Sequence, residues 1–274
     1  MTAEPLLAAR NLTVEYPGRG FRAKPTRVLH EIDADVYEGK TLGLVGESGS
    51  GKTTLGRALI GLVEPASGEV LFRGQNVSTR SRAEQKRLAR EIQVVFQDPY
   101  SSMNPSMSIS DILTEPLRVS GVSARDAVGQ VRALLDRVGL PSDAGDRLPR
   151  EFSGGQRQRI AIARALAVDP KVIVCDEPVS ALDLSTQLLI LDLLIELQRE
   201  RGVAYLFITH DIDAVRYISH DISVMYRGNI VEHGPTDAVI GDPQNDYTKK
   251  LLLASPVADP ARQAERRRLR RQLA

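Results

Sequence analysis

Apolar residues gather in short runs that alternate with helical patterns along most of the chain. Four runs are almost continuously apolar and rich in Val, Ile and Leu, and they span residues 41–46, 92–98, 171–178 and 203–211. Strands of this kind are typical of a sheet that helices cover on both faces. The pattern therefore predicts an α/β fold with a parallel core.

A second set of segments mixes apolar and polar positions, which is typical of antiparallel strands with one solvated face. These segments are "LTVEY", "VLHEIDADVYEGK", "GEVLFRGQNV" and "DISVMYRGNIVEHG". The last one resembles a hairpin with Gly228 and Asn229 near its turn. We therefore expect an antiparallel β subdomain beside the parallel core.

The helical pattern is strongest in "SARDAVGQVRALLDRVGLP", which begins at Ser123. Ser123 and Asp126 predict a helix start with a capping box, and Gly139 with Pro141 predicts its end. The residues expected on its apolar face are Ala127, Val128, Val131, Leu134, Leu135 and Val138. This predicts an α-helical subdomain over about residues 98–165 that interrupts a core of about 1–97 and 166–238.

Composition limits the classes of protein to consider. The chain has 274 residues, 42% of them hydrophobic and 26% charged, which suits a soluble domain with a subdomain. A formal net charge of +1 gives no reason to expect a nucleic-acid partner. The single cysteine, Cys175, excludes an internal disulfide and fits a reducing compartment. The most apolar stretch, from Leu188, is interrupted by acidic residues, and we expect no membrane-spanning helix.

A phosphate-binding loop is the clearest chemical signal. "GLVGESGSGKTT" fits the pattern G-x-x-x-x-G-K-[ST], and it lies between an apolar strand and an amphipathic helix. Lys52 is expected at the β- and γ-phosphates, the Thr53 hydroxyl at Mg²⁺ and Thr54 at the α-phosphate. A chance glycine-rich turn is the alternative, but strand, loop and helix all agree. The residues of this predicted ATP site are Gly46, Glu47, Ser48, Gly49, Ser50, Gly51, Lys52, Thr53 and Thr54.

Polar residues at the ends of three apolar strands predict the rest of a catalytic site. Asp176 is expected in the Mg²⁺ shell, and Glu177 beside it is suited to polarise an attacking water. Gln97 could reach Mg²⁺ and that water, and His210 could hydrogen-bond the γ-phosphate. Alone, each of the last two is more often structural, but their expected position at the same sheet edge as Lys52 and Glu177 favours the role in the site. No activating histidine lies near Cys175 in the sequence, so it is expected to be a buried apolar residue.

A second potential anion site stands in "EFSGGQRQR", directly before a helical stretch. Its residues Ser153, Gly154, Gly155 and Gln156 lie where backbone N–H groups of a helix start would face an anion. An ordinary glycine-rich helix start is the other interpretation of the same residues.

Together these motifs resemble the ATP-binding cassette (ABC) ATPases over about residues 5–238. The loop "GESGSGKTT", Gln97, "FSGGQ", "VIVCDE", "SALD" and His210 occur in the order of that family. The resemblance implies a RecA-like core with an antiparallel β subdomain and an inserted helical subdomain. It also implies that ATP and Mg²⁺ are bound, the metal by Thr53, Gln97 and Asp176. "FSGGQ" corresponds to the motif called the signature of the family, and Phe152 replaces the leucine that usually begins it.

The resemblance assigns further roles to residues of this chain. The signature would contact the γ-phosphate held by the loop of a partner cassette, so that neither site is complete in one chain. Tyr16 is expected to stack on adenine, and Phe21 could substitute for it. Asp183, in "SALD", would communicate across the dimer, although it could equally be a helix cap.

Three further stretches, "QDPYSSMNP", "CDEPVSALD" and "GDPQNDYTKKLLLASP", narrow the resemblance within the family. They make the chain most similar to ATP-binding subunits of the oligopeptide/dipeptide and nickel permease group. This implies an importer ATPase with a second cassette, two transmembrane permease subunits and an extracytoplasmic solute-binding protein. The expected location is the cytoplasmic face of the membrane. Residues 239–274 would form the group's C-terminal extension, ending in a basic run that is a frayed helix or a solvated tail. A non-transport ABC subunit, as in a phosphonate-cleaving complex, is the alternative.

Overall fold

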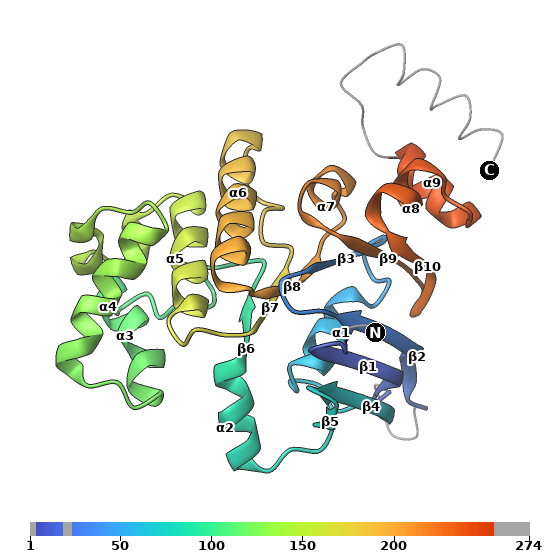
Figure 1. Cartoon of the computed structure of the whole chain (residues 1–274), viewed down its shortest axis with the longest axis horizontal. Helices are drawn as coiled ribbons and strands as arrows, with labels where there is room; N and C mark the ends of the chain where they lie inside the picture. The colour runs from blue at the N-terminus through green and yellow to red at the C-terminus, as the bar shows by residue number, and fades with distance from the viewer. Residues whose placement is uncertain (1–3, 19–23, 255–274) are drawn as a thin grey trace. The chain divides into compact units, whose positions relative to one another are not determined.

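The computed structural model describes residues 4–18 and 24–254, which divide into two compact units. The first unit combines the chain up to Thr79 with the chain from Leu206 onward. The second unit is the continuous segment Arg80–Tyr205. Figure 1 follows the chain through both.

An antiparallel sheet in the first unit has the strand order β2-β1-β4-β5. Residues of β1 pair with β2, as in Leu7↔Val36, and with β4, as in Leu7↔Phe72. Three of the four half-polar segments predicted as antiparallel strands form this sheet, whereas the fourth, "DISVMYRGNIVEHG", lies in the other sheet, which corrects its expected place. The strands are β1 (Leu7–Tyr16), β2 (Thr26–Val36), β4 (Ser67–Phe72) and β5 (Gln75–Asn76).

The first unit also contains the strand that leads into the glycine-rich loop. This strand, β3 (Thr41–Val45), is buried along its whole length and pairs in parallel with β9 (Asp221–Tyr226). β9 forms a hairpin with β10 (Asn229–Pro235), and Gly228 lies in its turn as predicted. β8 (Ala204–Ile208), which belongs to the first unit from Leu206 onward, lies on the other side of β3, because the Thr209 N–H donates to the Leu44 carbonyl over 3.1 Å. The helices of this unit are α1 (Lys52–Leu59), α7 (Ile212–Ile218), α8 (Thr236–Gly241) and α9 (Asp246–Ala254).

The second unit carries two parallel strands and most of the helices. β6 (Ile92–Val95) pairs in parallel with β7 (Val172–Asp176), and both follow the predicted apolar runs. One helix precedes β6, and further helices fill the segment between the two strands and continue after β7 (Figure 1). They are α2 (Arg82–Glu91), α3 (Ile109–Val119), α4 (Ala124–Arg137), α5 (Gly154–Leu166) and α6 (Leu184–Arg201), with 3₁₀ turns at Ser142–Asp146 and Pro149–Glu151.

Helix α4 confirms its predicted start at Ser123, but the Asp126 carboxylate accepts the Ser123 hydroxyl in place of the Ser123 N–H that a capping box would use, and the predicted apolar face also needs correction. The Ser123 hydroxyl accepts the Asp126 N–H and donates to the Asp126 carboxylate. Of the residues predicted on the buried face, Val128 is 66% exposed, whereas Val131 and Leu135 are buried. A buried stripe that contains Ala127, Val131 and Leu135 follows the i, i+4 spacing, and Val128 lies beyond its edge.

No helix among residues 4–18 and 24–254 is long and apolar enough to cross a bilayer. The basic run that ends the sequence lies outside the described residues.

Candidate functional site

The glycine-rich loop connects β3 to α1 and encloses its own lysine. Lys52 is only 5% exposed, and its Nζ donates to the carbonyls of Gly46 over 2.8 Å and of Glu47 over 2.9 Å. The Ser50 N–H closes the turn on the Glu47 carbonyl at 3.2 Å. The cation of Lys52 is therefore held inside the curl of the loop.

Gly46 is required by close approach as well as by backbone angle. Its φ is 151°, and a Cβ at this position would lie 2.1 Å from the Met225 carbonyl oxygen. The turn after β9 supports the same loop, because the Gly228 N–H donates to the Ser50 carbonyl over 2.9 Å. The hairpin β9–β10 thus packs against the loop and supports it through Met225 and Gly228.

Helix α1 begins at Lys52, so its first backbone N–H groups point back into the loop. No acidic residue lies in the first turn, which leaves that end attractive to an anion. Thr53 and Thr54 are half-buried on this turn, and Glu47, Ser48 and Gly49 are exposed at the tip of the loop.

Two other predicted residues belong to the same unit. His210 is exposed and follows β8, whose end lies beside the end of β3 through the Thr209–Leu44 hydrogen bond. The structure therefore brings His210 to the strand edge from which the loop departs. Tyr16 ends β1 and is half-buried, whereas the alternative aromatic, Phe21, lies outside the described residues.

The second unit brings Gln97 and Glu177 together. Parallel pairing of β6 and β7 sets Val95 opposite Cys175, so the residues after both strands leave the sheet at one edge. The Gln97 amide donates to the Glu177 carboxylate over 3.3 Å. Glu177 has a φ of 48°, a left-handed backbone that is uncommon for residues other than glycine and is found at functional sites.

The two residues before Glu177 differ in burial and in charge: Asp176 carries a carboxylate, and Cys175 a buried thiol. Asp176 is half-buried at the end of β7. Burial, with a contribution from the charge of Asp176, raises the pKa of the fully buried Cys175 thiol far above its ordinary value. The thiol therefore stays protonated, as predicted for a packing residue.

The signature residues form the N-terminus of α5. The Ser153 hydroxyl accepts the Gln156 N–H over 3.3 Å, and the Gln156 side chain accepts the Ser153 N–H over 2.9 Å, which is a capping box. Ser153, Gly154 and Gln156 are exposed, but Gly155 is buried. A Cβ on Gly155 would lie 2.3 Å from Cγ2 of Thr186.

Asp183 is the N-cap of α6, which was one of its two expected roles. Its carboxylate accepts hydrogen bonds from the Ser185 hydroxyl and from the Thr186 N–H and hydroxyl. These bonds hold the pKa of Asp183 well below its ordinary value. The residue is therefore charged and fixed in direction at neutral pH.

One contact was not expected from the sequence. The Tyr247 hydroxyl accepts the N–H of Glu47, in the glycine-rich loop, over 3.0 Å. The segment around Tyr247 has a weak apolar pattern, and only its turn-forming residues Asn245 and Asp246 indicate a helix start.

Comparison with known proteins places these motifs in one family. The profile described as ABC transporter matches residues 29–180. The glutathione import ATP-binding protein GsiA of Escherichia coli strain K12 is 53% identical over 269 residues, which is 96% of this chain and 43% of that protein. GsiA of Shigella sonnei has the same identity and coverage. The chain thus spans less than half the length of these curated relatives.

Solved structures agree with the fold. The ATP-binding cassette MJ0796, described as a dimer in a post-hydrolysis state bound to ADP and Pi, is 28% identical with a TM-score of 0.76, over 84% of this chain and 98% of that one. CbiO1 of Clostridium perfringens, part of the ABC transporter complex cbiONQ, is 28% identical with a TM-score of 0.77, over 90% and 95%. The predicted fold class, a parallel core with antiparallel and helical subdomains, is confirmed.

Proposed function

The chain belongs to the ABC transporter family, and on this basis we propose that it binds and hydrolyses ATP to power an importer. The observation that carries the proposal is the 53% identity, over 96% of the chain, to glutathione import ATP-binding proteins. Glutathione is a tripeptide, so the likeness also favours a short peptide or a peptide-like solute as the cargo.

In the proposed function, the loop and α1 bind the triphosphate. The buried Lys52 donates to the β- and γ-phosphates from its place inside the curl of the loop, and the N–H groups at the start of α1 complete the cradle. Tyr16 stacks on the adenine. The absence of an acidic side chain in the first turn of α1 supports this assignment.

Hydrolysis requires a group that orients and polarises water, and Glu177 is the candidate. Its hydrogen bond to Gln97 and its left-handed backbone fix the orientation of the carboxylate, which supports a role in orienting water. Gln97 holds the carboxylate and the water in line with the γ-phosphate, and His210 donates to that phosphate.

Thr53, Gln97 and Asp176 offer hydroxyl, amide and carboxylate oxygens, which is the donor chemistry that Mg²⁺ prefers, and they would hold this ion. When bound, Mg²⁺ would neutralise part of the phosphate charge.

Each ATP is proposed to lie between two cassettes. Ser153 and Gly154 are exposed at a helix N-terminus that has no lysine of its own, which supports a role toward the γ-phosphate of a partner chain. The partners are a second cassette, two transmembrane permease subunits and, through them, an extracytoplasmic solute-binding protein. The chain would act at the cytoplasmic face of the membrane, with Asp183 communicating between cassettes.

The test separates binding from hydrolysis. Glu177→Gln is expected to bind ATP, to lose hydrolysis by about 100-fold or more, and to accumulate as an ATP-bound dimer in size-exclusion chromatography. Lys52→Ala is the matched variant that is expected to lose nucleotide affinity in calorimetric titration. Turnover of Glu177→Gln near the wild-type rate would refute the assigned base.

Transport itself is tested by isolating the chain from detergent-solubilised membranes. Two membrane-spanning subunits should co-purify, and ATP hydrolysis in reconstituted vesicles should rise when a binding protein loaded with peptide is added. Recovery with soluble enzymes alone would favour the non-transport alternative.

A further inference from the structure

The C-terminal segment Asp242–Ala254 is attached to the glycine-rich loop by one tyrosine. The Tyr247 hydroxyl accepts the Glu47 N–H over 3.0 Å, although the two residues are 200 positions apart. Both residues belong to the first unit. This tail residue therefore contacts the backbone of the loop that is proposed to hold ATP.

The hydrogen bond falls on the peptide group that also binds Lys52. The carbonyl of Gly46 and the N–H of Glu47 belong to one planar peptide. Lys52 donates to that carbonyl over 2.8 Å, while Tyr247 accepts from that N–H over 3.0 Å. Rotation of the peptide plane would break both bonds, and each bond polarises the peptide in the sense that strengthens the other.

The aromatic ring of Tyr247 is held by a second tyrosine. Its centroid lies 4.2 Å from that of Tyr226, with a 35° angle between the ring planes. Tyr226 is the last residue of β9, and Gly228 in the turn that follows donates to the Ser50 carbonyl over 2.9 Å. The ring of Tyr247 thus packs on the same hairpin that supports the glycine-rich loop.

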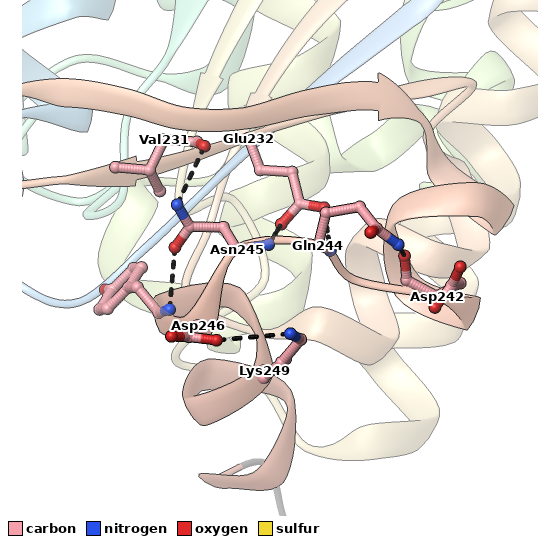
Figure 2. Close-up of polar contacts among 8 residues, drawn as sticks. Val231, Glu232, Asp242, Gln244, Asn245, Asp246 and Lys249 are labelled. Carbon is pink, nitrogen blue, oxygen red and sulfur yellow. Dashed lines mark hydrogen bonds and ion pairs between the residues drawn. The ribbon is translucent and has the colours of Figure 1, made fainter. Parts of the chain in front are cut away.

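A polar network around Asn245 and Glu232, which Figure 2 shows, holds the backbone of Tyr247. Asn245 accepts the Tyr247 N–H over 2.8 Å and donates from its side chain to the Val231 carbonyl over 3.3 Å. Glu232, on β10, accepts the N–H groups of Gln244 over 2.7 Å and of Asn245 over 3.1 Å. The side chains of Asn245 and Glu232 therefore link the residues at the start of α9 to β10.

Glu232 and Tyr247 are both partly buried, and burial favours the uncharged form of each side chain, which raises its pKa. At Glu232 burial raises the pKa, but the hydrogen bonds it accepts outweigh burial and leave the pKa below its ordinary value. At Tyr247 burial raises the pKa above its ordinary value, with the charge of Glu47 adding to it. Glu232 is thus an anion and Tyr247 a neutral phenol at physiological pH, which suits an uncharged contact beside a phosphate site.

We propose that Tyr247 is a positioning residue that fixes the Gly46–Glu47 peptide, and through it Lys52, in the orientation that nucleotide binding requires. The inference rests on the proposed ATP site. It adds a residue of the C-terminal extension to those that support nucleotide binding. The network around Asn245 then serves to position Tyr247.

The test removes only the hydroxyl, by Tyr247→Phe, in the full chain. Because one hydrogen bond is lost, we expect ADP to bind about 2- to 10-fold more weakly in calorimetric titration. KM for ATP should rise by a similar factor while kcat stays within about twofold, since the interaction is present before and during reaction. The Glu47 amide should also exchange with solvent faster and change its NMR shift.

Two further variants separate positioning from packing. Tyr247→Leu removes the ring as well and should lower both the affinity and the melting temperature. If Tyr247→Phe binds ADP as wild type and only Tyr247→Leu is impaired, the residue serves packing and the inference is overturned. Tyr217→Phe, at a half-exposed tyrosine of α7, is the matched hydroxyl deletion and should bind ADP normally.

A variant that leaves Tyr247 intact covers a failure of Tyr247→Phe to fold. Asn245→Ala frees the backbone that carries the tyrosine and should weaken ADP binding in the same direction; unchanged affinity would contradict the inference. A wild-type chain that binds no nucleotide overturns both this inference and the proposed function. Normal binding by the wild type with no effect of these variants overturns the inference alone.

Discussion

Alanine at Gly155 tests how closely α5 and α6 pack at the signature. The added Cβ would lie 2.3 Å from Thr186 Cγ2, more than 1 Å inside the ordinary carbon–carbon contact of about 3.5–4.0 Å. Overpacking of this kind costs about 1–3 kcal/mol. A contact this short belongs to the upper part of that range, about 2–3 kcal/mol, and alanine regains about 1 kcal/mol of helix propensity, so we expect a net loss of about 1–2 kcal/mol.

The neighbouring glycine supplies the control. A Cβ on Gly154 would meet Leu182 Cδ2 at 3.7 Å, an ordinary contact. Gly154→Ala therefore has the propensity gain without the clash. At about 2–4 °C per kcal/mol, Gly155→Ala should melt about 2–8 °C below wild type in circular dichroism, and Gly154→Ala should melt at or slightly above the wild-type temperature.

A second substitution should repair the first. Thr186→Ser removes Cγ2 and keeps the hydroxyl that donates to Asp183 over 2.7 Å. In the Gly155→Ala background it should restore most of the lost melting temperature, whereas on its own it should change stability little. Gly155→Ala that melts as wild type, or no recovery in the double variant, would refute the close approach of these two helices.

Three other predictions concern single groups. Gln156→Glu keeps an acceptor for the Ser153 N–H, so the melting temperature should hold, but its charge should reduce ATP hydrolysis about 10-fold, measured by phosphate release. Burial, then the charge of Lys40, lowers the pKa of His220, whose Nδ1 accepts the Thr41 N–H over 3.1 Å. Below the ordinary histidine pKa of about 6.5 the unfolded state binds more protons than the folded state. The urea midpoint should therefore be highest above this pH and fall as the pH drops toward the lowered pKa of folded His220. His220→Gln should weaken this dependence. Cys175, buried with a raised pKa, should resist iodoacetamide at pH 8 in the native protein and react fully in urea.

The parts of the fold that local patterns specify could be predicted from the sequence. Continuous apolar runs gave β3 and β7, and a hydroxyl three residues before a carboxylate gave the start of α4. Val128 was placed on the wrong face because a helical pattern does not say how wide the covered stripe is. The covered width depends on the partner elements that pack on the helix.

Contacts that depend on tertiary structure lay beyond local patterns. The Tyr247–Glu47 hydrogen bond joins residues 200 positions apart, and nothing near either residue specifies the other. The left-handed backbone of Glu177 was also unforeseen, because Glu has no intrinsic preference for it. The Gln97–Glu177 pair was foreseeable only as two strand ends at one edge, and the pairing register of β6 and β7 brings it to 3.3 Å.

The two interpretations of the signature, an ordinary helix start and an anion site, are compatible in physical terms. The capping box uses the Ser153 oxygen as an acceptor and satisfies the N–H groups of Ser153 and Gln156. An anion needs donors, and the Ser153 hydroxyl proton and the N–H groups of Gly154 and Gly155 remain outside the box because a helix cannot satisfy its first N–H groups internally. The cap therefore fixes the direction of these donors without using them. Of these residues, Ser153 and Gly154 are exposed, whereas Gly155 is buried. The sequence that starts α5 therefore also presents donors at an exposed helix start, and a phosphate from a second chain is the kind of group that would bind there.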